Sequence, residues 1–128
     1  MPDDDAWTIE FYIDERGESP VEEFLLGLDV RTKARLVWAF EQVRIRNLNA
    51  REPLVKHLDR ELWEVRQSSR GNIYRVIYLF FRGRRIVLLH GFQKKTQRTP
   101  PREIELAARR RNSFIASEER ERRRRDDG

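Results

Sequence analysis

The sequence contains no cysteine, which excludes disulfide bonds, thiolate metal sites and a cysteine nucleophile. Histidine is nearly as scarce, with two residues in 128, and no spacing of His, Asp and Glu resembles a metal site. No glycine-rich phosphate loop or serine-triad motif is present. These absences predict a site that uses neither a metal nor a cofactor.

Long hydrophobic runs are missing as well. Charged residues make up 38% of the chain and its mean hydropathy is −0.82. Because a membrane helix needs about 20 consecutive apolar residues, the sequence predicts no membrane span. The first residues, Met1–Asp5, are acidic and lack the basic-then-apolar order of a signal peptide, so we expect a cytoplasmic protein.

The balance of charge is basic. Lys and Arg number 27 against 22 Asp and Glu, which gives a net charge of +5 and a pI of about 10.1. A basic domain of this size favours a polyanionic partner, most commonly nucleic acid. The length fits one domain with a modest core.

The N-terminal part predicts one strand and two helices. Trp7–Ile13 alternates between apolar and polar residues, as expected for a half-buried strand near the edge of a sheet. Ser19 is placed to cap a short helix that ends near Gly27. Asp29 is placed to cap a longer helix that reaches about Asn47.

A wide apolar stripe on this longer helix predicts that it lies on the sheet. The stripe comprises Val30, Ala34, Val37, Trp38, Ile45 and Leu48, with Leu36, Phe40 and Val43 beside it. The basic residues Lys33, Arg35, Arg44 and Arg46 are assigned to the solvated face.

The remainder predicts a polar connection over residues 49–60, three strands and a last helix. The strands cover about Glu61–Arg66, Ile73–Phe81 and Arg85–Phe92, and their short turns make them antiparallel. Pro100-Pro101 opens the last helix. We therefore predict an α+β fold, a small twisted antiparallel sheet of about four strands with two N-terminal helices packed on it and a C-terminal helix.

Arg66 and Arg75 are the first candidates for a functional site. A symmetric turn between their strands would place them opposite each other on one face, where like charges destabilise a sheet. An anion between them would make sense of this arrangement. The other interpretation is that each arginine pairs with a nearby acid, such as Glu64 or Glu103.

Lys94, Lys95 and Arg98 follow the last strand and would add three cations to the same end of the sheet. Cleavage of RNA by its 2′-hydroxyl passes through a phosphorane with extra negative charge. Cations fixed around that charge stabilise the transition state more than the ground state. Alone, a cationic turn is typical of a solvated surface.

The same reaction needs a base and an acid. Glu52 and Glu64 are the candidate carboxylates, and a lysine within the cluster is a further candidate. His90 lies in an apolar strand, which favours a core histidine over a catalyst. His57 lies in the polar connection and its role stays open.

Three blocks, Glu61–Arg66, Tyr74–Tyr78 and Leu88–Ile104, resemble the phage-derived, HigB-like branch of the RelE/ParE toxin superfamily. The resemblance covers roughly residues 7–111 and implies a single RelE-like domain over residues 1–111. It also implies the toxin of a two-gene, type II toxin–antitoxin pair that cleaves mRNA on the ribosome. The expected partners are therefore ribosome-bound mRNA and an antitoxin, here a helix-turn-helix protein.

The resemblance also assigns residues. The basic positions of the family fall on Arg66, Arg75 and either Lys94 or Lys95, and Glu52 resembles a glutamate that acts as base in one subgroup. Arg75→Ala is accordingly expected to abolish activity and leave folding intact. Further residues expected to bind RNA are Arg98, Arg70 and Lys56.

The chain departs from the family pattern in two places. RelE has two lysines where this chain has Leu62 and Glu64, and its C-terminal tyrosine has no counterpart after Tyr78. Residues 112–128 are Arg- and Glu-rich and are expected to form a helical or disordered tail, which either binds ribosomal RNA or is inert. A ParE-like inhibitor of DNA gyrase and an inactive, antitoxin-binding relative are the alternative functions.

Overall fold

A computed structural model describes residues 6–127, and the expectations for Met1–Asp5 and Gly128 lie outside the described residues. Five strands form one mixed sheet in the order β1-β5-β4-β3-β2. The strands are β1 (Thr8–Phe11), β2 (Val55–Asp59), β3 (Leu62–Ser69), β4 (Asn72–Phe81) and β5 (Arg85–Lys94). The helices are α1 (Pro20–Leu26), α2 (Val30–Arg46), the short 3-10 turn η1 (Asn47–Asn49) and α3 (Pro101–Asp127).

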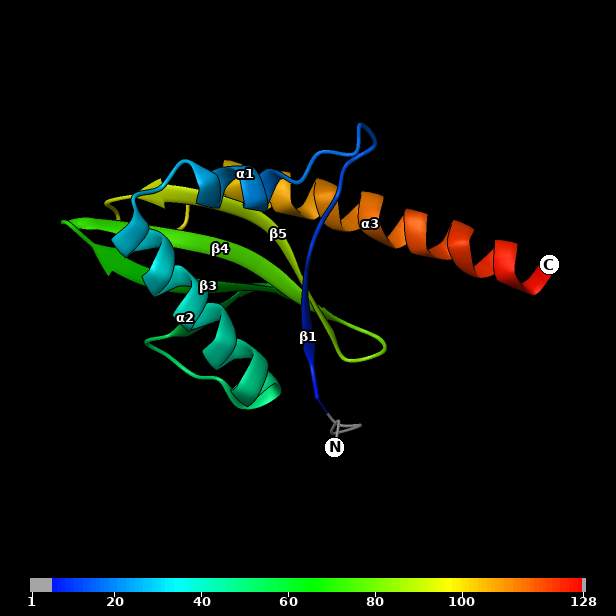
Figure 1. Ribbon diagram of the computed structural model, residues 1–128, viewed down its shortest axis with the longest axis horizontal. Helices are drawn as coiled ribbons and strands as arrows, with labels where there is room; N and C mark the ends of the chain where they lie inside the picture. Colours follow the sequence, from blue (N-terminus) through cyan, green and yellow to red (C-terminus); the bar gives the residue numbers. More distant parts are fainter. Residues whose placement is uncertain (1–5, 128) are drawn as a thin grey trace.

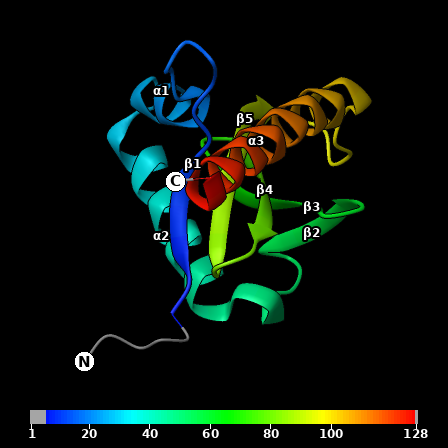
Figure 2. The ribbon, with the colours of Figure 1, turned by 90° about the vertical axis from the view of Figure 1, so that its right-hand side faces the viewer.

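Helices cover both faces of this sheet, which confirms the α+β fold (Figures 1 and 2). On one face α1 and α2 pack through Val21, Leu36 and Val43 against strand residues such as Val76 and Tyr78. On the other face α3 packs through Ala107 and its neighbours against Ile77, Leu79, Val87 and Leu89. The central strands β4 and β5 are therefore buried on both sides, as their apolar sequences predict.

Two features of the sheet differ from the sequence prediction. The strand β1 lies at the edge, as expected, but it runs parallel to β5, pairing Thr8 with Arg85 and Phe11 with Leu88. Two helices and three strands separate β1 from β5 along the chain, so no short turn imposes antiparallel pairing. The second difference is β2, which forms within the expected polar connection and pairs antiparallel with β3.

The helix α2 begins at the predicted position, but a different face from the predicted one packs on the sheet. Asp29 accepts a hydrogen bond from the Thr32 amide at 2.7 Å and so caps the helix. The buried face consists of Thr32, Leu36, Ala39, Phe40 and Val43. The predicted stripe is largely exposed, and its exposed members include Val30, Val37, Trp38, Ile45 and Leu48.

A hydrogen bond helps to explain this orientation of α2. The Thr32 and Ser69 hydroxyls lie 2.8 Å apart, and both residues are buried. Leu36 and Val43 lie one and three turns further along the same face and pack against the sheet. Both faces of α2 are apolar, so the hydrophobic pattern alone did not decide which one met the core.

The helix α1 ends at Leu26, next to the predicted Gly27, but Ser19 does not cap it. Ser19 Oγ is buried and makes no hydrogen bond among the described residues. A glycine lets α1 approach the sheet, because a Cβ atom at Gly91 in β5 would collide with the ring of Phe24.

The helix α3 starts at the predicted prolines and continues without interruption past residue 111 to Asp127. Two contacts extend its attachment beyond that boundary. Phe114 packs edge-on against Phe81, and Glu118 accepts a hydrogen bond from Arg85 at 2.5 Å. The end of the helix then projects beyond the sheet (Figure 1). No helix within residues 6–127 combines the length and apolar composition of a membrane span.

Candidate functional site

The two arginines singled out from the sequence are register partners. Arg66 of β3 lies opposite Arg75 of β4, and Arg75 lies opposite Phe92 of β5. Because side chains alternate along a strand, Arg75 shares the α3 face of the sheet with Ile77, which belongs to the core beneath α3. The predicted placement of the two cations is confirmed.

The anion between them is supplied by the chain itself. Glu64 accepts a hydrogen bond from Arg66 Nε at 2.5 Å and one from the Thr99 hydroxyl at 2.7 Å. Arg75 Nη1 lies 3.8 Å from the other side of the same carboxylate, at Oε1. Both Glu64 and Arg75 are fully buried. Pairing with a nearby acid, one of the two interpretations, is therefore what the structure contains.

Arg75 also fastens the loop that connects β5 to α3. Its guanidinium donates to the Thr99 hydroxyl at 3.1 Å and to the Thr96 carbonyl. Burial lowers the pKa of Arg75, the adjacent Glu64 carboxylate acts in the opposite direction, and Arg66 lowers it further. With no exposed surface, Arg75 acts by holding the loop and setting the local charge, not by touching a ligand from solvent.

A pocket of about 490 Å³ lies beside this cluster and is called here the Glu52 pocket. Glu52 and Arg51 enter it from the loop before β2, Arg46 from the end of α2 and Arg66 from β3. Arg66 also donates to the Gln97 carbonyl at 3.0 Å, which joins the pocket wall to the loop after β5. The pocket therefore brings one carboxylate together with three guanidinium groups.

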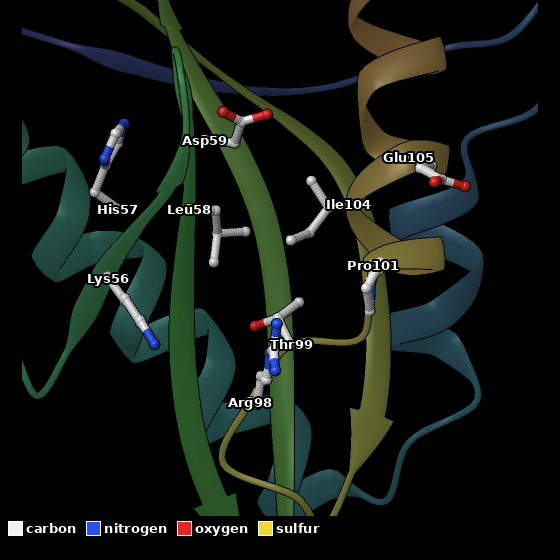
Figure 3. A pocket seen from close by; sticks show the side chains of 9 residues that line it. All are labelled: Lys56, His57, Leu58, Asp59, Arg98, Thr99, Pro101, Ile104 and Glu105. Atoms are coloured by element: carbon white, nitrogen blue, oxygen red, sulfur yellow. The ribbon is translucent and has the colours of Figure 1, made fainter.

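A second pocket of about 410 Å³, the Lys56 pocket, is lined by β2, the loop after β5 and the first turn of α3. Lys56 extends from β2 toward the loop that carries Arg98 and Thr99, and Leu58 and Ile104 lie above that loop in the view (Figure 3). Lys56 lies opposite Glu64 in the register of β2 and β3. The Lys56 pocket and the Glu52 pocket therefore both lie next to the cluster of Glu64, Arg66 and Arg75.

The other predicted cations take different positions. Lys94 ends β5, two residues after Phe92 and therefore on the same face as Arg75, and Lys95 is exposed on the loop that follows. Neither residue is among the described residues that line the two pockets. Arg70 lies at the β3–β4 turn, where it pairs with Asp29 at 3.2 Å, away from both pockets.

Sequence reasoning missed three contributors. Arg46 had been assigned to a solvated face, Arg51 was passed over, and Thr99 was not considered. Arg51 directly precedes Glu52, and this adjacency was the one available signal. The contribution of Arg46 depends on where α2 ends over the loop, and that of Thr99 on the folding of residues 95–99 onto Glu64.

Both histidines lie outside the Glu52 pocket. His90 is almost fully buried, with Nε2 2.9 Å from Glu103 Oε1, Nδ1 3.1 Å from Arg110 and its ring stacked on Phe92. This is the core histidine that the sequence favoured. His57 lines the Lys56 pocket, but its ring points away from the other labelled side chains (Figure 3). The ring centre lies 4.9 Å from that of Trp63.

The environment of His90 predicts sensitivity to mild acid. Burial lowers the pKa of His90, and the nearby Arg110 lowers it further, while Glu103 opposes the shift. A histidine whose pKa is depressed by folding takes up its proton more readily in the unfolded chain, so the native state loses stability as pH falls below about 6.5. Urea unfolding at pH 7.5 and 5.5 is expected to show a smaller loss for His90→Gln than for the unaltered chain. Equal losses would contradict this role of His90.

No group of three or more His, Asp and Glu side chains comes together as a metal site in the described part of the chain. The chemical groups of the Glu52 pocket are the carboxylate of Glu52 and the guanidinium groups of Arg46, Arg51 and Arg66. Such a set suits a phosphodiester, because arginine binds phosphate oxygens through two parallel hydrogen bonds.

Comparison with known proteins identifies the family of the chain. The family model described as phage-derived protein Gp49-like (DUF891) matches residues 23–112, which span the sequence from α1 to the first turns of α3 and include every residue of both pockets. No curated protein matches the chain. The chain therefore belongs to the phage-derived Gp49-like family, a RelE/HigB-like family of toxin type.

Proposed function

We propose that this protein is the toxin of a type II toxin–antitoxin pair and that it cleaves mRNA on the ribosome, as in the HigB-like branch. The Gp49-like family is associated with toxins of such pairs. The observation that carries the proposed chemistry is the Glu52 pocket, in which a carboxylate and three arginines from separate segments line one cavity.

The proposed reaction is attack of an RNA 2′-hydroxyl on the adjacent phosphorus. Glu52 takes the proton of the 2′-hydroxyl, and the bond from phosphorus to the 5′-oxygen breaks, leaving a 2′,3′-cyclic phosphate. Lys94, at the end of β5, or Lys95, on the loop that leads to Gln97 at the pocket wall, returns a proton to the departing 5′-oxygen. General acid and base groups of this kind contribute about 10²–10⁴-fold each.

Arg66, Arg46 and Arg51 bind the non-bridging oxygens, whose negative charge grows in the phosphorane. Two of the three are held by hydrogen bonds: Arg66 by Glu64 and the Gln97 carbonyl, and Arg51 by the Leu48 and Ala50 carbonyls. Arg75 is proposed as a positioning residue that fixes Thr99 and the loop. Lys56 and Arg98 in the Lys56 pocket, together with Arg70, provide salt-sensitive attraction for the RNA backbone.

The experiment is primer extension on a reporter mRNA incubated with the purified chain, with and without ribosomes that translate the message. The proposal expects new 5′ ends only on translated message. Cuts on free RNA at the same rate would remove the dependence on the ribosome. Absence of cuts in both reactions would overturn the nuclease function, and inhibition of DNA gyrase supercoiling would then be measured directly.

A further inference from the structure

A second surface, distinct from the two pockets, lies along the outer side of α2. Its apolar members are Val30, Ala34, Val37, Trp38, Ile45 and Leu48, and we call it the α2 stripe. Val37 is 49% exposed, Trp38 56% and Val30 87%. Large apolar side chains scattered singly on a surface are ordinary, but a continuous exposed patch marks an interaction site.

The stripe borders a groove of about 850 Å³ between α2 and the edge strand β1. Trp7, Ile9 and Phe11 form its β1 side, and Val37, Trp38 and Phe40 form its α2 side. The charged residues in its lining are Glu41 and Arg44, which pair with each other. The groove is therefore apolar in character and electrically neutral within its lining.

The charges around the stripe indicate what covers it. Helix α2 carries five cations, Arg31, Lys33, Arg35, Arg44 and Arg46, against one acid, Glu41. At 100° per residue, Lys33 and Arg44 fall along one edge of the stripe and Arg31, Arg35 and Arg46 along the opposite edge. Glu41 lies within the stripe and pairs with Arg44. An apolar strip between two basic rows is complementary to a helix with apolar residues in the centre and carboxylates on both sides.

We propose that the α2 stripe and its groove bind an acidic amphipathic helix of the antitoxin. This inference rests on the proposed toxin function. The helical part of the stripe, from Val30 to Ile45, is about 23 Å long at 1.5 Å per residue, which matches a partner helix of about four turns. A second copy of this chain is a poorer occupant, since a twofold contact through α2 would bring the basic rows of both copies together.

The position of the stripe also links binding to inhibition. Trp38 lines both the groove and the Glu52 pocket. A helix that covers Trp38 therefore stands at the rim of the pocket that we propose binds the scissile phosphate. Occupation of the stripe would exclude a ribosome-bound message without any contact to Glu52 itself.

The test uses the full chain and, as probe, the protein encoded by the adjoining gene of its two-gene pair. Isothermal titration calorimetry is expected to show a Kd raised about 30-fold or more by Val37→Ser combined with Ile45→Ser, as for the loss of central interface anchors. Neither residue lines the Glu52 pocket. The matched control is Ile13→Ser, which alters an equally exposed apolar residue away from α2 and is expected to keep the original Kd.

Charge reversal provides an independent measurement. Arg31→Glu combined with Lys33→Glu is expected to weaken binding and to reduce its dependence on salt, because one cation is removed from each edge of the stripe. An unchanged Kd in both double variants, or no binding by the unaltered chain, would overturn the proposal. A dimer of the chain alone that Val37→Ser/Ile45→Ser converts to monomer would also overturn it, in favour of a second copy.

The nuclease proposal and the docking proposal are tested by separate measurements. Primer extension without the probe protein reports cleavage alone, and the serine double variant is expected to cut mRNA as the unaltered chain does and to resist inhibition. If the unaltered chain does not cleave mRNA but the variants change the Kd as expected, the nuclease function is refuted and the docking surface is supported.

Discussion

Arg75→Ala is expected to destabilise the protein by about 3–5 kcal/mol, because it removes one partner from a buried ion cluster. Arg75 and Glu64 have no exposed surface, and Arg75 holds both Thr96 and Thr99. The sequence alone suggested that this substitution would leave folding intact, and the burial of Arg75 replaces that expectation. Urea unfolding monitored by circular dichroism measures the change in the free energy of unfolding.

A matched control separates the ion cluster from simple loss of volume. Glu64→Leu combined with Arg75→Met replaces both buried charges by apolar groups of similar size, which often costs little or even stabilises. The double variant is therefore expected to unfold at a higher urea concentration than Arg75→Ala, although Arg66 then loses its partner. A single Arg75→Ala variant as stable as the unaltered chain would show that the cluster does not hold the loop.

Arg66→Ala is expected to lower the single-turnover rate of mRNA cleavage on ribosomes by about 10²–10³-fold, as removal of one preformed donor to a developing oxyanion does. Arg66 combines partial exposure with two fixed contacts, to Glu64 and to the Gln97 carbonyl, so its guanidinium is held ready for a phosphate. Arg16→Ala, at an exposed turn, is the control for loss of one surface charge and is expected to keep the full rate.

Glu52→Gln provides the companion variant should Arg66→Ala fold poorly. Glu52 is exposed and its removal leaves the ion cluster untouched, so stability is expected to stay unchanged while cleavage falls by about 10²–10⁴-fold. Full cleavage by a folded Glu52→Gln protein would remove Glu52 from the role of base. Full cleavage by both variants would remove the Glu52 pocket from the mechanism.

The local signals in the sequence predicted much of the framework. Short turns set the antiparallel pairing of β3, β4 and β5, and this register placed Arg66 opposite Arg75 as expected. Asp29 and the proline pair located the starts of α2 and α3. These features depend on residues close together in sequence, which is why they could be predicted.

The features that were missed depend on contacts between distant residues. The orientation of α2 could not follow from its pattern, because both of its faces are apolar and the Thr32–Ser69 contact joins separate elements. The burial of Glu64 likewise depends on the loop after β5 meeting β3, and the pocket shared by Arg46 and Glu52 depends on α2 meeting the loop before β2. The parallel partner of β1 is β5, the last strand along the chain, so their pairing has no local signature.

The chemical ends of cut mRNA test the central claim most directly. A message incubated with ribosomes and the purified chain is cleaved, and the upstream fragment is examined for its terminal group. Attack by the 2′-hydroxyl predicts a 2′,3′-cyclic phosphate on that fragment, and no cut at a position carrying a 2′-deoxynucleotide. A free 3′-hydroxyl, cleavage at the 2′-deoxy position, or no cleavage at all would contradict the account.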